Sequence, residues 1–413
     1  MRESPKRFKI LISAAETSSD IHAAELLREL KKKCPSLDAF GVGGPALQAQ
    51  GLRTLVDARS LLAMGFSEIL SRLPRIFAAL GILARAAKIE QPDVAVVVDY
   101  PDFHFRLARK LRRLGIPVVY YIPPKVWAWR RYRVHALRKY FAKVLCVFPF
   151  EEFFYAREGV HARYVGNPLL DELPLQKTKA QAREELRLDS NSRVVTLMPG
   201  SRPAELKAHF QVMLKAAALA SGQMGESLIA LVPLPKTAEL EEIAKQLVQW
   251  QAQNPQESVR VEFRLSQGNS SDCLLAADAA LVKSGTSTLE AALLGCPHAV
   301  VYRPSWLTIW IFRLFIRYKG PVGLVNLVGG WRTGDPFLAR EILCEEVRPE
   351  VLSQELVALL LDSEKRALML KGFASLRAQL EADLKGRHPS ETVANEILAL
   401  VSIPGSEAGP GEC

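Results

Sequence analysis

The chain has 413 residues, 49% hydrophobic and 24% charged, a balance that excludes wholesale disorder and gives room for two or three domains. Basic residues outnumber acidic ones by 54 to 44, and the formal charge of +10 favours anionic partners such as nucleic acid, acidic lipid or a phosphorylated substrate. Six cysteines without a C-x-x-C pair predict buried free thiols in a reducing cytosol and no metal site.

The apolar run at residues 10–12 is too short for a signal peptide, and no stretch reaches the roughly 18 to 20 apolar residues of a membrane span. We therefore expect a cytoplasmic protein, with a membrane surface as one possible partner.

Short β-branched runs alternate with longer segments of helical period through most of the chain. Candidate strands come first at residues 8–14, 38–42, 93–99, 117–122, 143–148 and 163–165, with helical patterns at 21–33 and 105–114. After a polar, proline-punctuated stretch at 171–179, candidate strands resume at 193–198, 227–232, 259–263, 279–282 and 298–302. From about Arg348 onward the pattern is purely helical.

This alternation predicts an α/β fold with two doubly wound, Rossmann-like domains whose strand ends face a cleft. We expect an N-terminal domain at residues 1–172 and a second at 173–347. Helices at 348–403 should pack back on the first domain, and a Gly/Pro/Ser/Glu tail at 404–413 should be disordered.

Asp99 ends the apolar run 94–98, which places its carboxylate at the mouth of the first sheet. Partial burial there could raise its pKa and let it act as a general base. The alternative, equally supported by spacing, is that Asp99 and Asp102 only cap the following helix, with Asp102 the better cap.

The loop after the first strand holds Glu16, Ser19 and Asp20. Ser19 or Asp20 is the expected N-cap of the first long helix. Glu16 precedes that cap by several residues and would point from the loop toward the strand ends, which gives it a weaker claim to a site role.

Two turns in the second half, at residues 199–202 and 284–290, come where a predicted strand meets a helix. Such turns offer unpaired N–H groups and hydroxyls to an anion, and the helix dipole favours negative charge there. The candidate phosphate-binding residues are Gly200, Ser201, Arg202, Ser284, Gly285 and Thr286. The sequence has no P-loop motif.

Two side chains near these turns could add to the site. Arg202 carries fixed donors for a diphosphate, although it could instead be a surface arginine paired with Glu205. Glu290 lies about one turn inside the second helix, where it could bind sugar or ribose hydroxyls. A Ser/Thr-rich helix cap that binds no ligand would explain the hydroxyl groups equally well, but it would not explain the glutamate at position 290.

Two aromatic and basic patches occupy residues 125–133 and 306–317. If the second is helical, one stripe collects Trp306, Trp310, Arg313 and Arg317. A very apolar helix edged with Trp and Arg suits an anionic membrane surface, and the alternative is a core helix with snorkelling arginines. Neither patch carries a named nucleic-acid module, so we expect no nucleic-acid partner.

A series of short blocks extends from residue 10 to about residue 350. They are 12–20 (ISAAETSSD), 63–70 (AMGFSEIL), 98–103 (VDYPDF), 126–130 (VWAWR), 148–151 (FPFE), 165–169 (VGNPL), 198–202 (MPGSR) and 284–290 (SGTSTLE). Taken jointly, they resemble the signature blocks of lipid-A-disaccharide synthases.

The resemblance implies a GT-B glycosyltransferase, peripheral on the cytoplasmic face of the inner membrane of a Gram-negative cell. The first domain would take the acceptor, 2,3-diacylglucosamine 1-phosphate, and the second the donor, UDP-2,3-diacylglucosamine. An inverting transfer would form a β-1,6 bond and release UDP. The resemblance implies no cofactor and leaves a homodimer possible.

The resemblance also implies roles for single residues. The aspartate of the family's D-x-P-D-F block falls on Asp99, its first-loop glutamate on Glu16, its P-G-S-R arginine on Arg202 and the asparagine of its V-S-L-P-N-L block on Asn326. No metal is needed if Arg202 and the helix termini supply charge for the departing diphosphate.

The chain departs from the family pattern at several presumed site loops, which predicts an altered acyl or sugar preference. The residues are Ala15, Ser19, Lys125, Asn167 and Cys344. Two other functions stay open: a GT-B relative acting on a soluble UDP-sugar, such as a UDP-N-acetylglucosamine 2-epimerase, and a membrane-associated binding protein that has lost the chemistry.

Overall fold

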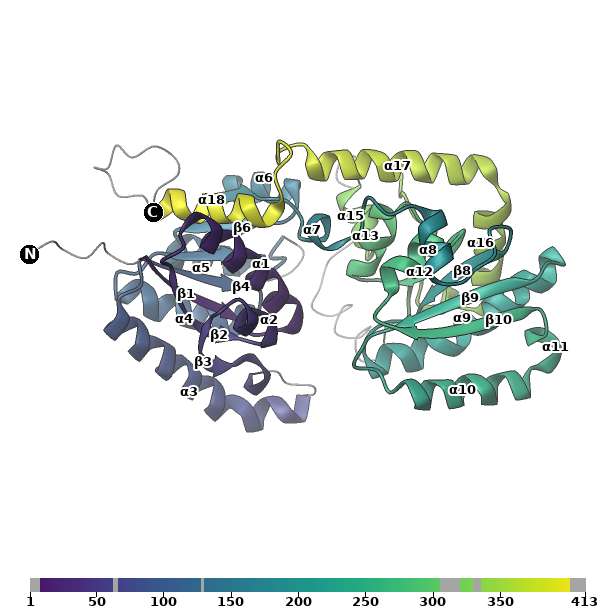
Figure 1. Ribbon diagram of the computed structural model, residues 1–413, viewed down its shortest axis with the longest axis horizontal. Helices are drawn as coiled ribbons and strands as arrows, with labels where there is room; N and C mark the ends of the chain where they lie inside the picture. Colours follow the sequence, from purple (N-terminus) through teal and green to yellow (C-terminus); the bar gives the residue numbers. More distant parts are fainter. Residues whose placement is uncertain (1–7, 62–65, 128–129, 305–319, 330–335, 402–413) are drawn as a thin grey trace, which may run out of the picture. The chain divides into compact units, whose positions relative to one another are not determined.

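The computed structural model describes residues 8–61, 66–127, 130–304, 320–329 and 336–401. The chain divides into two compact units, one from the segments Met1–Asp171 and Leu380–Cys413 and the other from Glu172–Gln379 (Figure 1). Each unit is built on one parallel sheet with helices packed against it. The expected α/β fold with two doubly wound sheets is confirmed.

The sheet of the first unit has the strand order β3-β2-β1-β4-β5-β6-β7. Its strands are β1 (Lys9–Ala14), β2 (Asp38–Gly43), β3 (Arg53–Asp57), β4 (Val94–Val98), β5 (Val118–Tyr121), β6 (Lys143–Cys146) and β7 (Ala162–Tyr164). β1 pairs with β2 on one side and with β4 on the other, so the strand order reverses between β1 and β4. Ligands of doubly wound folds bind beyond the carboxyl ends of the strands at such a reversal.

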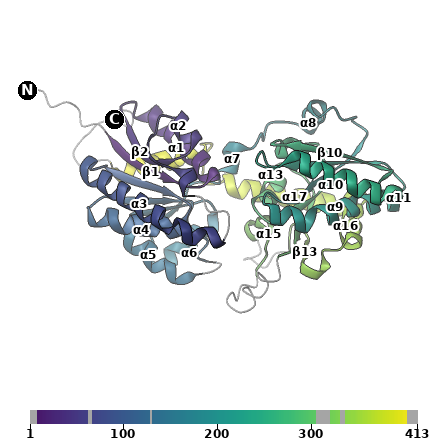
Figure 2. The same ribbon diagram turned by 90° about the horizontal axis from the view of Figure 1, so that it is seen from below.

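Helices cover both faces of this sheet. They are α1 (Thr17–Lys33), α2 (Pro45–Ala49), α3 (Phe66–Glu90), α4 (Pro101–Arg113), α5 (Val134–Tyr140), α6 (Pro149–Arg157) and α18 (Pro389–Val401), with 3₁₀ turns η1 (Ala58–Ser60) and η2 (Arg131–Arg133). α3, α4 and α5 pack side by side, and α1 packs against α18 and α2 (Figures 1 and 2). This double cover explains why every residue of β4 is buried and apolar.

The sheet of the second unit has the order β10-β9-β8-β11-β12-β13. Its strands are β8 (Arg193–Met198), β9 (Leu228–Leu234), β10 (Val261–Gln267), β11 (Ala279–Lys283), β12 (His298–Tyr302) and β13 (Glu341–Leu343). The order again reverses at the first strand of the unit, β8, which pairs with both β9 and β11.

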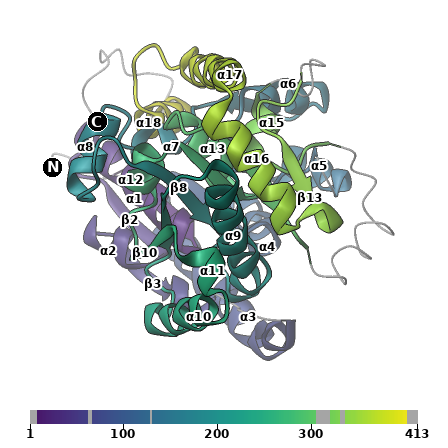
Figure 3. The same ribbon diagram turned by 90° about the vertical axis from the view of Figure 1, so that its right-hand side faces the viewer.

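The helices of the second unit form two groups. After α7 (Leu169–Glu172), which belongs to the first unit up to Asp171, the described ones are α8 (Lys179–Glu185), α9 (Pro203–Met224), α10 (Leu240–Gln253), α11 (Pro255–Ser258), α12 (Ser270–Ala276), α13 (Thr286–Leu293), α15 (Leu324–Val328), η4 (Cys344–Glu346), α16 (Pro349–Leu361) and α17 (Ser363–Glu381). α9 packs against α16, and α12 packs against α8 and α13 (Figure 3). α9 and α13 begin just beyond the carboxyl ends of β8 and β11.

The last helices of the chain are divided between the two units. α16 packs on α9 of the second unit, whereas α18 packs on α1 of the first. Tyr164 donates a hydrogen bond to the carbonyl of Leu380 (2.7 Å), which holds the chain where it re-enters the first unit. The return to the first unit therefore involves α18, not the whole of 348–403.

The structure adds two strands that the sequence did not indicate, β3 and β13. Both are short edge strands, and β3 is bounded by Arg53 and Asp57, so neither shows the apolar run of a central strand. The expected free thiols are confirmed for Cys34, Cys146, Cys273 and Cys296, which are buried, but Cys344 is exposed. No helix within the described ranges is long and apolar enough to cross a membrane.

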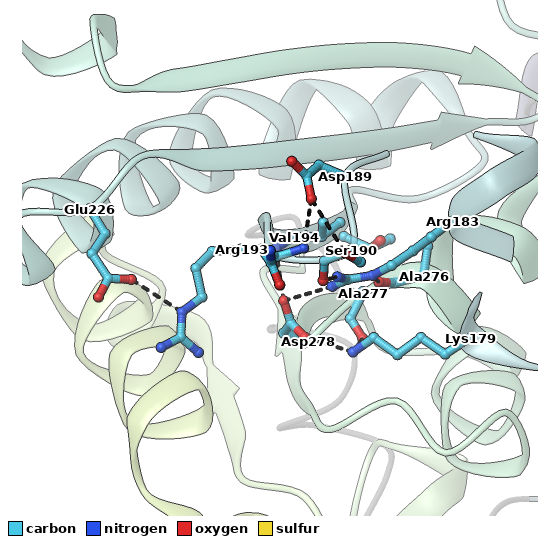
Figure 4. A network of polar contacts seen from close by, with 12 residues as sticks. Lys179, Arg183, Asp189, Ser190, Arg193, Val194, Glu226, Ala276, Ala277 and Asp278 are labelled. Carbon is cyan, nitrogen blue, oxygen red and sulfur yellow. Dashed lines mark hydrogen bonds and ion pairs between the residues drawn. The ribbon is translucent and has the colours of Figure 1, made fainter. Parts of the chain in front are cut away.

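A partly buried carboxylate, Asp278, ties α8 to the second sheet (Figure 4). It accepts hydrogen bonds from Lys179 Nζ (2.6 Å), Arg183 Nη2 (3.1 Å) and the amide of Val194 (2.9 Å). Arg183 also donates to the carbonyls of Ala276 (3.0 Å) and Ser190 (2.5 Å). Burial alone would raise the pKa of Asp278, but these donors outweigh it and hold the pKa below its usual value.

Asp278→Asn should lower the free energy of unfolding by about 2 to 3 kcal/mol at pH 7, because two cations lose their charged partner. Since the folded-state pKa is lowered, the stability from Asp278 is present above the unfolded value near 3.8 and disappears as pH falls through the folded value. Urea unfolding at neutral and acidic pH measures both effects. Asp189→Asn, an exposed carboxylate of the same region, should change stability by less than about 0.5 kcal/mol; equal losses in both variants would contradict the prediction.

Candidate active site

Asp99 follows β4 directly, and its backbone is tightly held. Its φ of +53° is left-handed, a conformation that aspartate tolerates better than most residues. Its amide donates to the carbonyl of Tyr121 (3.2 Å), and its carbonyl accepts from the hydroxyl of Tyr120 (3.0 Å) and from His104 Nδ1 (2.5 Å). Burial raises the pKa of the Asp99 carboxyl, and the Tyr100 amide, Lys125 and His22 only partly offset it. A carboxylate with a raised pKa at this strand end is suited to accepting a proton.

His104 is the side chain that orients this strand end. It is fully buried on α4, and its Nε2 lies 2.8 Å from the hydroxyl of Ser13 on β1. Nδ1 must donate to the Asp99 carbonyl, and in the neutral ring Nε2 then accepts from the Ser13 hydroxyl. Burial lowers the pKa of His104 to about 4, in agreement with that assignment. His104 was not a candidate from the sequence, because its partner on β1 lies 91 residues away.

Neither Asp99 nor Asp102 is the N-cap of α4, so the capping alternative is not observed. The N-cap of α4 is Tyr100, itself left-handed with φ +45°, and no side chain bonds to the cap. Asp102 lies in the first turn and forms an ion pair with Arg133, with Arg130 3.7 Å away. Asp102 therefore connects α4 to η2.

The prediction of Ser19 or Asp20 as the N-cap of α1 is wrong, because the cap is Glu16. Ser19 stands at the third helical position, where its hydroxyl accepts from the Glu16 amide (2.9 Å) and donates to the Glu16 carbonyl (2.8 Å). Asp20 caps another helix instead: its carboxylate accepts from the amides of Gly44 (2.6 Å) and Ala46 (2.9 Å) at the start of α2. Glu16 thus lies directly beyond β1, next to β4 in the sheet.

Glu151 is a second buried carboxyl group of the first unit that the sequence did not single out. It is 1% exposed and accepts from Trp127 Nε1 (2.9 Å) and from the amides of Val147 and Phe148 (3.2 Å each). Burial raises the pKa of Glu151 to about 7 despite these donors. The Trp127 ring also meets Phe150 edge to face at 5.2 Å. Glu151 therefore holds Trp127, in the segment after β5, against the residues that follow β6.

The second unit has a pocket of about 400 Å³ beyond the carboxyl ends of β8, β9 and β11. It brings together almost all of the residues predicted to bind the donor. Those lining it are Gly200, Ser201, Arg202, Ser284, Gly285, Thr286 and Glu290, joined by Glu205 and Lys283, among others. Its volume is within the range of small-molecule sites.

The turn at the start of α9 requires glycine at position 200. Gly200 has φ +122°, and a Cβ there would lie 2.5 Å from Glu205 Cβ. Glu205 folds back to accept from the amides of Ser201 (3.0 Å) and Arg202 (3.4 Å), so α9 is capped by its own carboxylate. No described side chain caps α13, whose first residues line the pocket together with Gly285. α13 is therefore the helix whose first amides we expect to be available to an anion.

Lys283 is a charged pocket residue that was not among the predicted site residues. Its Nζ lies 2.7 Å from Glu205 Oε1 and joins the end of β11 to α9. Burial alone would raise the pKa of Glu205, but Lys283 and the two amides hold it below its usual value. Because Glu205 binds Lys283, the expected alternative of an Arg202–Glu205 surface pair is not formed; the Arg202 side chain is exposed at the pocket.

Glu290 and Asn326 differ in their access to the pocket. Glu290 Oε1 accepts from Ser270 (2.9 Å) and Ser271 (3.2 Å), and burial raises the pKa of this carboxyl. Asn326 is 1% exposed, donates to the Ala339 carbonyl (2.8 Å) and Glu341 Oε1 (2.9 Å), and does not line the pocket. It anchors the chain before β13. Trp306, Trp310, Arg313 and Arg317 lie outside the described residues.

Two of the departures from the family pattern have clear structural roles. Asn167 is buried, donates to the Val147 carbonyl (3.2 Å) and accepts from the Leu169 amide (3.1 Å). Ser19 completes the cap of α1. Among the described side chains, no group of His, Cys, Asp and Glu could hold a metal ion.

Known proteins match this chain over nearly its whole length. The lipid-A-disaccharide synthase of Myxococcus xanthus is 41% identical over 372 residues, 90% of this chain and 93% of its own. That of Nitrosococcus oceani is 35% identical over 385 residues, 93% and 95% of the two chains.

Solved structures with a similar fold are far more distant in sequence. Acinetobacter baumannii MurG has a TM-score of 0.55 at 15% identity, covering 92% of this chain and 99% of its own. The UDP-GlcNAc 2-epimerase of Neisseria meningitidis, bound to UDP-GlcNAc, has a TM-score of 0.55 at 13% identity, with 95% and 99% covered. The lipid-A-disaccharide synthetase family matches residues 10–390, and this chain belongs to that family.

Proposed function

We propose that this protein joins UDP-2,3-diacylglucosamine to 2,3-diacylglucosamine 1-phosphate through a β-1,6 bond and releases UDP. Family membership supports lipid A disaccharide synthesis. The observation that carries the donor assignment is the pocket of the second unit, which is lined by the first residues of α13, by Arg202 and by Lys283. These groups favour a nucleoside diphosphate.

Asp99 is the proposed general base of the transfer. It would take the proton of the acceptor hydroxyl as that oxygen bonds to the anomeric carbon of the donor. The bond from that carbon to the diphosphate oxygen breaks at the same time, with inversion, and UDP leaves with the electron pair. The strand-end position and raised pKa of Asp99 support this role. Glu16, beyond the neighbouring strand β1, is proposed to assist it at the acceptor.

The second unit would stabilise the charge of the departing diphosphate. The α13 amides and the Arg202 guanidinium are proposed to bind its oxygens, and Lys283 neutralises the Glu205 carboxylate that would otherwise repel them. Glu290 is proposed to bind ribose or sugar hydroxyls, exchanging its serine hydrogen bonds for those of the ligand. Asn326 is proposed to act indirectly, by fixing the chain beside α13.

Mass spectrometry of products after incubation with both diacylated substrates tests this function. The expected product is the tetraacyl disaccharide 1-phosphate, formed with one UDP per turnover and undiminished by EDTA. Conversion of UDP-N-acetylglucosamine alone would instead support the epimerase-like alternative, and absence of turnover would support the inactive binding protein. Loss of activity in EDTA that Mg²⁺ restores would refute the proposal that protein groups alone bind the diphosphate.

We also propose that the protein rests on the cytoplasmic face of the inner membrane, since both proposed substrates carry acyl chains. The segment 306–317 is the candidate anchor, with its tryptophans in the headgroup region and its arginines on anionic lipid. In flotation with anionic vesicles, a Trp306→Ser/Trp310→Ser/Arg313→Ser/Arg317→Ser variant should bind more weakly than the wild type. Equal flotation of the folded variant would make this segment a core helix.

A further inference from the structure

A second cavity, in the first unit, is not explained by sugar transfer. It is a groove of about 450 Å³ between α4 and α5, with η2 at one end. We call it the α4–α5 groove; its polar lining is formed by Asp102, Arg106, Arg133, His135 and Lys139. Three permanent cations therefore face one carboxylate, so the groove has an excess of positive charge.

The cations of the groove differ in how far they are already neutralised. Arg133 is 10% exposed and forms the ion pair with Asp102. Arg106 and Lys139 are exposed, and among the side chains that the structure describes no carboxylate pairs with either, since Asp102 pairs with Arg130 and Arg133. They lie over aromatic rings instead: Arg106 is 5.8 Å from the Phe77 ring and Lys139 is 5.8 Å from the Tyr140 ring. A ring orients a cation without cancelling its charge, so both remain available to an anion.

Exposed aromatic side chains flank these cations. Tyr132, which lines the groove, is 68% exposed, and Phe77 on α3, the ring under Arg106, is 57% exposed. Rings and basic groups on one surface are typical of proteins that enter the headgroup layer, where the ring sits among lipid and the cation meets phosphate. A pocket for a free, fully hydrated phosphate would gain nothing from exposed apolar rings.

We propose that the α4–α5 groove binds the phosphate of an anionic membrane lipid, with Phe77 and Tyr132 in the headgroup layer. Arg106 and Lys139 are the phosphate ligands, and Arg133 is a fixed charge behind them. This site does not depend on the chemistry assigned to Asp99 or on segment 306–317. It would give the first unit its own contact with the membrane.

The test is flotation with phosphatidylcholine vesicles that contain or lack phosphatidic acid, using the full chain. Arg106→Gln/Lys139→Gln should weaken binding to the anionic vesicles by about 30-fold, from roughly 1 kcal/mol for each cation near the surface. The control is Lys110→Gln/Arg112→Gln on α4, which removes the same charge from exposed positions outside the groove. It should lose much less.

Three outcomes decide the proposal. Equal losses in the two variants would overturn it, because only the net charge would then matter. Release of the wild type by inorganic phosphate, but not by chloride at the same ionic strength, would also overturn it in favour of a free-phosphate site. Turnover of the groove variant on detergent-dispersed substrates should stay at the wild-type level, which separates a failure here from a failure of the proposed transfer.

Discussion

Asp99→Asn should lower turnover by about 10²- to 10⁴-fold with the fold intact, because asparagine keeps the shape of the side chain but cannot accept the proton. The backbone bonds that hold residue 99 come from Tyr120, His104 and Tyr121 and do not involve the carboxylate. The variant should therefore melt like the wild type. Single-turnover kinetics with saturating donor measures the chemical step directly.

The pH profile adds a second readout of the same role. Burial raises the pKa of Asp99, so the wild-type rate should fall as pH drops through that raised value and should level off above it. The residual rate of Asp99→Asn should lack this acidic limb. Asp57→Asn is the matched control, an aspartate at the end of β3 that pairs with Arg59 at 2.6 Å. Near-normal turnover of Asp99→Asn, or an equal loss in Asp57→Asn, would reject the base.

The fold was largely predictable because its central strands are buried on both faces. β4 and β8 appear in the sequence as apolar runs, and β8 and β12 begin and end where the pattern placed them. The edge strands were harder. β10 was expected to end at residue 263 but continues to Gln267 through Arg264 and Ser266, polar residues that an edge strand can carry.

The sequence indicated those parts of the candidate site that lie within one short segment of the chain. The glycine turn before α9 and the carboxylate after β4 are local features. The cap of α1 was misassigned because Asp20 has its partners on α2, 24 to 27 residues away, which leaves Glu16 as the cap. The Lys283–Glu205 pair spans 78 residues. A lysine at the end of a strand, immediately before a glycine turn, was the one local signal available for it.

The long-range contacts also change how the donor pocket should work. The sequence suggested that both turns present amides to the diphosphate, yet Glu205 occupies those of Ser201 and Arg202, just before α9. The α13 amides and the Arg202 guanidinium then remain for the ligand, with Lys283 holding Glu205 in place. We therefore expect Arg202 to act through its side chain, not through the helix that it begins.

Arg202→Ala should weaken UDP binding by about 10- to 100-fold in calorimetry, because a hydrogen bond to a charged group contributes about 1.5 to 3 kcal/mol. The side chain is exposed and Glu205 binds Lys283 instead, so the fold should not change. The affinity for uridine, which lacks the diphosphate, should stay the same. Lys207→Ala removes one exposed cation from the same helix outside the pocket and should leave UDP affinity nearly unchanged. If Lys207→Ala costs as much as Arg202→Ala, or if uridine binding falls in parallel, Arg202 does not contact the diphosphate.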